Sequence, residues 1–334
     1  MKSLRNLFVL VAMLAIPAFA QELTSDINLT VLDSSGNPIS GASASVTFEP
    51  TNSKASKNTS SSGSVAFRGL RPGGPYTIVV SFGGNSESLS NVSLTVGDTF
   101  RSNVTLSAGS LEEIVTVASK LNTNKDIGFS TSISSDDISK FSSVTRDLKD
   151  FVRLNPWSVA NDASDGQDAE LSIAGGGSRT NDILVDGASY NDDFGLNASG
   201  YPGQASPINL DSIEQLNVRV APSSIEYSNF EGGVIEVVTK GGTNDFKGSV
   251  YSYDRGDSFV GDSVDGRDID QEFDDTSEGF TLGGPIIKDK AFFSVAFESN
   301  DKTTPINYGP VGSGAPFSQP ITIEQVRQIQ TDTQ

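Results

Sequence analysis

Hydrophobic and polar residues alternate along several short segments in the first third of the chain. Ile27, Leu29 and Val31 share one face of the first segment, and the segments with strand character lie at 27–33, 44–50, 63–70, 76–82, 88–97 and 100–108. Stretches rich in glycine, proline and serine separate them. Alternation with a period of two residues between turn-forming stretches is typical of β-strands. The pattern therefore predicts a small β-sandwich over residues 22–107.

The period of the pattern changes in the middle of the chain. Apolar residues recur there at the three- and four-residue spacing of a helix, at Ile138, Phe141, Val144, Leu148, Phe151 and Val152. Asp136 or Asp137 is the expected N-cap of this helix, and Pro156 is expected to end it. Short segments with strand character follow at 170–175, 181–187, 213–220 and 232–240. We therefore predict a small α+β domain over 136–243, in which strands outnumber helices.

Longer alternating segments follow residue 243. The segments 279–287 and 291–299 are joined by a short charged turn, and a loop at 254–278 with ten acidic residues and two arginines separates them from 244–254. Alternating strands of about ten residues with short turns on one side and long polar loops on the other are typical of outer-membrane β-barrels. We predict the start of such a barrel over 244–334, with a short helix at 321–330. A soluble β-meander is the alternative.

A strand-forming segment stands in the polar region between the first two domains. Residues 111–120, LEEIVTVASK, contain a run of β-branched residues inside a linker that we predict over 108–135. The unpaired backbone groups of such a segment favour pairing with a strand of another chain. The alternative is that 113–117 forms a last edge strand of the sandwich.

The first twenty residues have the organisation of a secretory signal peptide. Lys2 and Arg5 precede ten apolar residues at 7–16, and the A-x-A site that ends at Ala20 predicts cleavage before Gln21. The apolar stretch is shorter than the ~20 residues that a membrane-spanning helix needs, and a retained anchor helix is the alternative.

The composition excludes several classes of function. The chain has 23 basic and 42 acidic residues, a net charge of −19, and no histidine or cysteine. Nucleic-acid binding needs clustered basic residues, whereas the common zinc sites, thiol chemistry and histidine catalysis need the two missing residue types. We therefore predict a protein that is not an enzyme, binds no nucleic acid and uses no metal or other cofactor. Calcium binding by the acidic loop 254–278 stays open, because only Asp265-Gly266 is similar to part of an EF-hand.

Several motifs follow one another in an order that resembles a known family. Three stretches resemble the carboxypeptidase-regulatory-like domain: VLD (31–33), GNPISGA (36–42) and GSVAF (63–67). Others resemble the plug domain of TonB-dependent outer-membrane receptors: SSDDI (134–138), GSRTN (177–181), ILVDG (183–187) and FEGGVIEVVTKGGTN (230–244). The order as a whole is similar to the Oar-like group of these receptors. The resemblance implies a mainly β chain with a prealbumin-like β-sandwich, an α+β plug domain and the first antiparallel strands of a truncated transmembrane β-barrel.

The resemblance also implies partners and site residues. It identifies a TonB box, the segment that pairs with the energy-transducing protein TonB, at Glu112, Glu113, Ile114, Val115, Thr116 and Val117. It implies structural roles in the plug for Arg179, Asn181, Asp186, Gly187, Gly232 and Gly233. The implied partners are TonB with its inner-membrane motor proteins, the outer membrane and an extracellular ligand that the sequence does not identify.

Energised import across an outer membrane is the function that the resemblance implies, with the plug gating the barrel. The alternative is a cell-surface binding or adhesion protein that uses the sandwich without transport. Residues 244–334 supply three or four strands, whereas a receptor barrel of this kind has about 22. We therefore expect the sequence to be the N-terminal portion of a longer protein or a truncated product.

Overall fold

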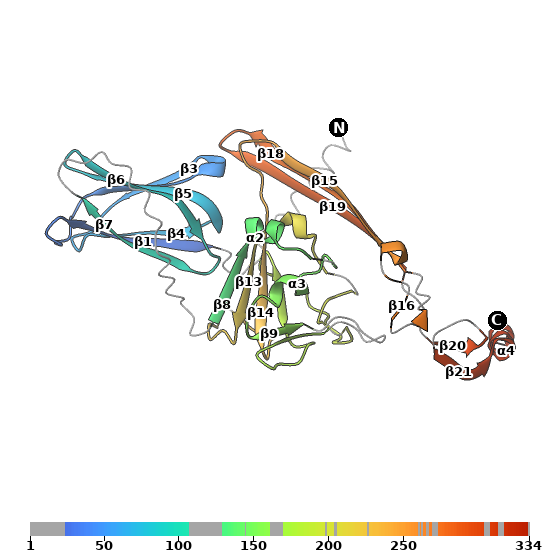
Figure 1. Cartoon of the computed structure of the whole chain (residues 1–334). Coiled ribbons are helices and arrows are strands. Elements are labelled where there is room, and N and C mark those ends of the chain that lie inside the picture. The colour runs from blue at the N-terminus through green and yellow to red at the C-terminus, as the bar shows by residue number, and fades with distance from the viewer. Residues whose placement is uncertain are drawn as a thin grey trace, which may run out of the picture.

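The computed structural model describes residues 24–106, 129–143, 145–160, 170–197, 199–203, 206–225, 227–259, 261, 263–264, 267–268, 273–303, 308–312 and 317–332. The predicted signal peptide, the predicted TonB box and much of the acidic loop lie outside these residues. The described chain has three main parts: an N-terminal sandwich (24–106), a middle domain (129–243) and a long sheet (247–303), which Figure 1 shows. Within these parts, no helix combines the length and the apolar character needed to cross a membrane.

The N-terminal sandwich consists of two packed sheets. One sheet has the strand order β4-β1-β7 and the other has the order β3-β2-β5-β6. Their strands are β1 (Ser25–Asp33), β2 (Ser43–Phe48), β3 (Ser53–Asn58), β4 (Ser64–Leu70), β5 (Gly73–Phe82), β6 (Asn85–Leu94) and β7 (Thr99–Leu106), and the short 3-10 helix η1 (Glu49–Thr51) follows β2. Alternate residues such as Ile27, Leu29 and Ile78 fill the core between the sheets. β3 escaped prediction because its sequence, SKASKN, lacks apolar alternation.

A mixed five-stranded sheet forms the centre of the middle domain. Its order is β12-β11-β14-β13-β8, with β11 and β14 parallel and the other neighbours antiparallel. The strands are β8 (Phe129–Ser134), β11 (Asp182–Val185), β12 (Ala188–Ser189), β13 (Ile213–Val220) and β14 (Gly233–Thr239); β9 (Ser158–Ala160) and β10 (Leu171–Ile173) form a separate pair, and η2 (Leu210–Ser212) precedes β13. The residues of β8 were predicted to belong to the linker, but they form an edge strand beside β13. Their polar sequence, FSTSIS, gives little sign of this pairing.

The single helix predicted from residue 136 to Pro156 is wrong. The structure has two short helices instead, α2 (Ser135–Lys140) and α3 (Lys149–Val152). The N-cap of α2 is Ser134, and neither of the two predicted aspartates takes that place. Asp137 is the partner of Ser134 in a capping box, in which each side chain bonds the backbone N–H of the other residue.

Side-chain hydrogen bonds account for the break between the two helices. The hydroxyl groups of Ser143 and Thr145 both donate to the carboxylate of Asp150. Such local bonds compete with the regular backbone bonds of a helix. Arg146, which lies in this break, has a φ of 51°, a value that no residue has within a right-handed helix. The apolar spacing therefore reported the burial of Ile138, Leu148, Phe151 and Val152, but Phe141 is 41% exposed and the helix is not continuous.

The middle domain packs its core on one face of the central sheet. This core includes Leu216 and Val218 from β13, Ile235 from β14, and Leu148 and Phe151 from the helical segment. Both faces of β14 are nevertheless buried, because every residue from Gly233 to Val238 is buried. A sheet with two buried faces needs a second layer of cover.

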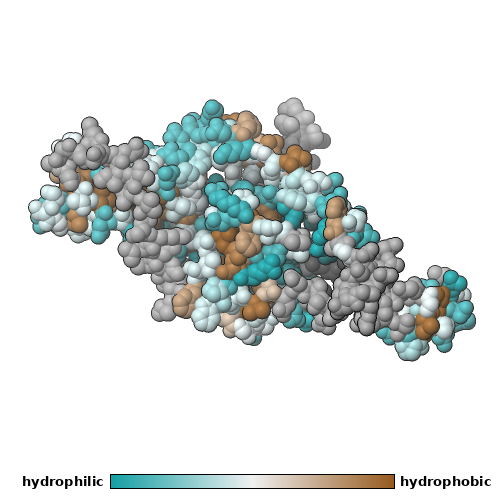
Figure 2. Space-filling model, in the orientation of Figure 1, coloured by the Kyte–Doolittle hydropathy of each residue, from teal (hydrophilic) through white to brown (hydrophobic). Residues whose placement is uncertain are grey.

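The long sheet has the order β15-β18-β19 and is antiparallel throughout. Its strands are β15 (Lys247–Gly256), β18 (Asp274–Ile287) and β19 (Ala291–Thr303). The register places Val250, Phe280 and Phe297 side by side on one exposed face, and Tyr251 and Glu298 on the opposite face. The alternation predicted for these segments is confirmed. Figure 2 shows hydrophobic surface, in brown, along this sheet and over the middle domain.

The remaining described elements are short. They are η3 (Asp257–Phe259), β16 (Ser263–Val264) and β17 (Arg267–Asp268) near the acidic loop, and β20 (Tyr308–Val311), β21 (Phe317–Thr322) and α4 (Ile323–Asp332) beyond the long sheet. The helix α4 confirms the one predicted at 321–330. The mainly β fold class, with a sandwich, an α+β domain and the first antiparallel strands of an open sheet, is confirmed.

Candidate functional site

Asp186 and Gly187 form the two-residue turn between β11 and β12. Both have positive φ values, 46° and 76°, which is the geometry of a type I′ hairpin turn and explains the Asp-Gly sequence. The Asp186 carboxylate accepts hydrogen bonds from the backbone N–H of Thr239 at 2.9 Å and from its hydroxyl at 2.6 Å. The turn is therefore tied to the end of β14.

Asn181, Gly232 and Gly233 lie together at the opposite end of these two strands. The Asn181 side chain is 1% exposed, and its Nδ2 donates to the carbonyl of Leu171 at 2.7 Å. A Cβ atom on Gly232 would lie 2.0 Å from the carbonyl oxygen of Ile173, and one on Gly233 would lie 2.5 Å from the Ile173 side chain. Glycine is needed at both positions because β10 approaches this backbone so closely.

Arg179 precedes Asn181 by two residues, and its side chain is exposed. Its positive charge acts on Asp192, whose carboxylate accepts hydrogen bonds from the backbone N–H groups of Phe194, Leu196 and Asn197. The pKa of Asp192 is lowered chiefly by the N–H of Asn197, and less by the positive charge of Arg179. The structure thus brings five of the six motif residues to the two ends of β11 and β14, and leaves Arg179 at the surface.

The middle domain meets the long sheet at Arg146. The guanidinium group of Arg146 forms an ion pair with Asp211, and it lies 3.5 Å from the carboxylate of Glu298 on β19. It also stacks over two rings of β15, at 4.2 Å from the centroid of Tyr253 and 4.8 Å from that of Tyr251. The side chain is only 15% exposed. A single cation thus connects the middle domain to two strands of the sheet.

A chain of hydrogen bonds supports this contact. The hydroxyl group of Tyr251 donates to Glu298 at 2.8 Å and accepts a bond from the side-chain amide of Asn209 in the middle domain. All the sheet residues involved point to the polar face, opposite the apolar face that carries Phe280. The middle domain therefore covers the polar face of the sheet.

Comparisons with known proteins match each of the three parts. Family models match a carboxypeptidase regulatory-like domain over residues 26–107, a TonB-dependent receptor plug domain over 123–235 and an outer membrane beta barrel domain over 238–310. The chain contains the plug domain and part of the barrel domain of a TonB-dependent receptor. The middle domain is its plug, and the long sheet (247–303) is hereafter called the wall. The resemblance to an Oar-like receptor is confirmed.

Individual relatives agree with this family. The chain is 34% identical over 137 residues to the TonB-dependent transporter Oar of Myxococcus xanthus, which covers 38% of this chain and 12% of that protein. It is 29% identical over 188 residues to the probable TonB-dependent siderophore receptor PirA of Acinetobacter baumannii, which covers 53% of this chain and 23% of that protein. The crystal structure of PirA matches with a TM-score of 0.41 and 24% identity, over 52% of this chain and 24% of that one. The chain thus spans less than a quarter of the length of either of these two relatives.

The sequence analysis did not predict the contact that joins the plug to the wall. Arg146 lies within the helix predicted between residue 136 and Pro156, which does not form, and Asp211 lies outside every predicted strand and helix. The positions of Tyr251 and Glu298 could have been predicted in part, because alternation along β15 and β19 places both residues on the face opposite Val250 and Phe297. Pairing them with Arg146 requires knowledge of the tertiary contact.

Burial changes the pKa of the Asp182 carboxyl group inside the plug. Asp182, at the start of β11, is 3% exposed, and its carboxylate accepts a hydrogen bond from the side-chain amide of Asn191 at 2.8 Å. Burial raises the pKa of Asp182, and the bonds from Asn191 and Ser189 only partly oppose this. The partners are neutral side chains of the plug itself, so this carboxyl is a structural group.

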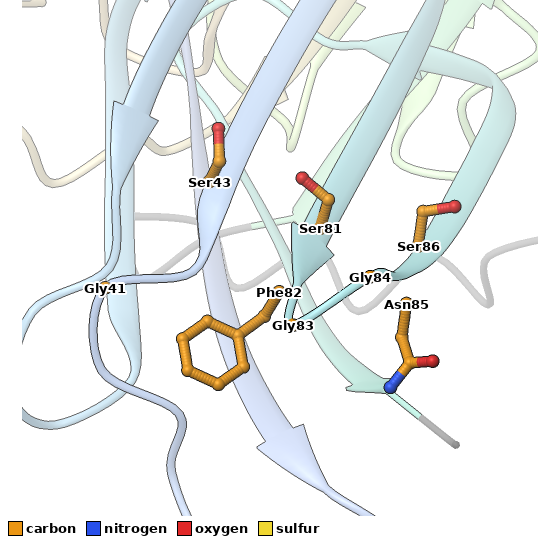
Figure 3. Close-up of a pocket in the computed structure, with 8 residues that line it drawn as sticks. All are labelled: Gly41, Ser43, Ser81, Phe82, Gly83, Gly84, Asn85 and Ser86. Atoms are coloured by element: carbon orange, nitrogen blue, oxygen red, sulfur yellow. The ribbon is translucent and has the colours of Figure 1, made fainter. Parts of the chain in front are cut away.

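The described residues offer no site for a metal, since no three acidic side chains cluster there. Side chains 262–272 lie outside the described residues, so the structure does not test calcium binding by the acidic loop. A shallow pocket of about 440 Å³ lies at one end of the sandwich, where the β5–β6 hairpin meets the start of β2. Figure 3 shows its lining, which is uncharged: Gly41, Ser43, Ser81, Phe82, Gly83, Gly84, Asn85 and Ser86. Such a lining has no group for acid–base chemistry.

Proposed function

We propose that this chain supplies the gate and the energy-coupling segment of an outer-membrane transporter whose uptake is driven through TonB. The observation that supports it most is the contact between the plug and the polar face of the wall. The wall has an apolar face suited to lipid and a polar face suited to a lumen, and Arg146 attaches the plug to the polar face. A domain held inside a barrel in this way closes the pore, so transport needs a force that moves the plug.

The segment Glu112–Val117 is the proposed point at which that force acts. It lies outside the described residues, and the proposal rests on its sequence and on its place between the sandwich and the plug. Ile114, Val115 and Val117 favour an extended strand, and pairing through backbone hydrogen bonds requires little else of the sequence. We propose that TonB, in the periplasm, adds this segment to one of its sheets and pulls.

The proposed location is the outer membrane, with the sandwich on the periplasmic side. The signal peptide at 1–20 directs export, with cleavage after Ala20. The short turn at 288–290 between β18 and β19 belongs on the periplasmic side, because barrels of this kind have short periplasmic turns and long outer loops. The transported ligand is extracellular and its chemistry is open.

Competition for TonB tests this function without knowledge of the ligand. The receptor is overproduced in cells that import a radiolabelled ferric siderophore through a second TonB-dependent receptor. An intact segment should withdraw TonB and slow that uptake. Deletion of 112–117 should restore the uptake rate, whereas deletion of six residues at 120–125 in the same linker should not.

Two results would count against the proposal. Equal competition by both deletion variants would mean that 112–117 does not engage TonB. No competition by the intact receptor, with normal amounts in the outer membrane, would favour a surface-binding protein that does not use TonB.

A further inference from the structure

The second face of the plug sheet is polar and yet buried. Leu216 and Val218 of β13 face the plug core, so Gln215, Asn217 and Arg219 point the other way. These three side chains, together with Glu236 of β14, are 5%, 0%, 3% and 4% exposed. Buried polar and charged groups are strongly unfavourable unless they find hydrogen-bond partners. The cover on this face must therefore supply specific hydrogen bonds.

The sandwich supplies this cover with the turn between β6 and β7. The backbone N–H of Val96 donates to Oε1 of Gln215 at 3.0 Å, and the carbonyl of Val96 accepts from Nη2 of Arg219 at 2.6 Å. Val96 is 0% exposed, although the core clusters of the described residues do not include it. It is therefore buried by contact with the plug.

Arg219 is the centre of this contact. Its guanidinium group lies 3.2 Å from Glu236 inside the plug and 3.9 Å from Asp98 of the sandwich. It also lies over the ring of Tyr227, at 5.3 Å from the centroid. Burial raises the pKa of Glu236, and the charge of Arg219 opposes that effect. A cation shared by carboxylates of both domains resists their separation, because an unpaired buried charge is strongly unfavourable.

The turn is shaped to approach Arg219 closely. The N–H of Asp98 donates to the carbonyl of Thr95 at 3.1 Å, and Gly97 between them has a φ of +70°. This is the position of a tight turn that requires glycine. A Cβ atom at Gly97 would lie 2.7 Å from Nη2 of Arg219. Glycine thus satisfies both the backbone conformation and the contact between domains.

A second contact lies where the plug continues into the wall. The N–H of Asn244 donates across the interface to the carbonyl of Pro50 at 2.8 Å. The Arg71 guanidinium packs against the backbone at Gly241, where a Cβ atom would lie 2.2 Å from it. Figure 1 shows the sandwich beside both the plug and the near end of the long strands. Two separate patches therefore fix its orientation.

We infer that the second face of the plug sheet is a docking surface for the chain's own sandwich, occupied by the turn Thr95–Asp98 and anchored by Arg219. The docked sandwich holds the plug and its junction with the wall in one arrangement, so the sandwich and the plug move as one body. This inference does not depend on coupling to TonB.

Hydrogen–deuterium exchange on the full chain tests the docking, because two amides donate across the interface. The amides of Val96 and Asn244 should be protected in the wild-type chain. Arg219→Met should raise both exchange rates by about tenfold or more, since the anchoring charge is lost. The amides of β14 should keep their protection, which shows that the plug stays folded. Arg179→Met, which removes an exposed arginine of the same domain, should change neither amide.

A pair of glycine variants keeps the test decisive if Arg219→Met unfolds the plug. Gly97→Ala and Gly69→Ala carry the same backbone cost, because both glycines have a φ of +70°. A Cβ atom at Gly69 meets nothing within 4 Å, whereas one at Gly97 meets Arg219. Gly97→Ala should expose the amide of Asn244, and Gly69→Ala should not.

Three outcomes would overturn the inference. One is a wild-type chain whose Val96 and Asn244 amides exchange as fast as those of an unstructured peptide. Another is a folded Arg219→Met variant in which both amides keep their protection. The third is equal exchange at Asn244 in the two glycine variants.

Discussion

The side chain of Arg146 contacts the rings of both Tyr251 and Tyr253 of the wall, and the effect of removing it can be worked out from the structure. The guanidinium group lies 4.2 and 4.8 Å from the two tyrosine ring centroids. A cation–π contact contributes about 0.5–1 kcal/mol at exposed sites and about 2 kcal/mol when desolvated, and this side chain is 15% exposed. The ion pair with Asp211, which is 33% exposed, adds up to about 1 kcal/mol. Arg146→Ala should therefore lower the free energy of unfolding by about 2–3 kcal/mol.

The backbone of Arg146 is in the left-handed conformation, which makes glycine a second informative substitution at this position. Arg146 has a φ of 51°, and the left-handed conformation costs a residue other than glycine about 1–2 kcal/mol. Arg146→Gly removes the side chain and this strain together. The greater entropy of glycine in the unfolded chain offsets about 0.4–1 kcal/mol of the gain. Arg146→Gly should thus be more stable than Arg146→Ala by about 0.5–1 kcal/mol.

Equilibrium unfolding in urea, in detergent, measures both differences. Trp157 is the only tryptophan of the chain and lies in the plug, where its ring stacks on Phe129 at 5.7 Å, so its fluorescence follows this domain. Arg179→Ala is the control, because that arginine is exposed. The reasoning is refuted if Arg146→Ala lies within about 0.5 kcal/mol of the wild type, or if the glycine variant is the less stable of the two.

Two further variants test the interior of the plug. Gly232→Ala should lower the free energy of unfolding by at least about 1–3 kcal/mol in the same urea assay, because its Cβ would lie 2.0 Å from the Ile173 carbonyl oxygen. Gly203→Ala is the control and should cost little, because a Cβ at Gly203 meets nothing within 4 Å. Equal losses of stability in the two variants would contradict this. The pKa of Asp182 is raised in the folded state, so the folded protein holds this proton more tightly than the unfolded chain does. The resulting stability is fully present below the unfolded-state pKa of about 4 and is lost as the pH rises through the folded-state pKa. Asp182→Asn should therefore be more stable than the wild type at pH 7 and equal to it at pH 3, in unfolding curves recorded at both values; a variant that is less stable at pH 7 would show that the charge is favourable.

Alternation predicted most of the strands correctly because burial repeats every two residues in them. β13 begins and ends where it was predicted, at Ile213 and Val220. Two of the strands that escaped prediction, β3 and β8, are edge strands with polar sequences. An edge strand needs only backbone partners on one side, so its side chains carry little information about the pairing.

The contacts between domains were not accessible from the sequence. Arg219 and Glu236 interrupt apolar runs in β13 and β14, which indicates polar cover on one face of the sheet. Nothing in the sequence pattern identifies the turn Thr95–Asp98 as that cover, because the two segments are more than a hundred residues apart. The helix break at Arg146 was hidden in the same way, since apolar spacing reports burial and does not report backbone continuity.

Site-specific photo-crosslinking in living cells tests the central claim most directly. A photoreactive amino acid at Thr116 should form a product with TonB, detected with an antibody to TonB, when the receptor is in its own outer membrane. Val115→Pro removes a backbone N–H and should abolish the product, whereas Val115→Ile should preserve it. Absence of the product from the parent receptor, or equal yields from the proline and isoleucine variants, would contradict a strand-paired TonB box.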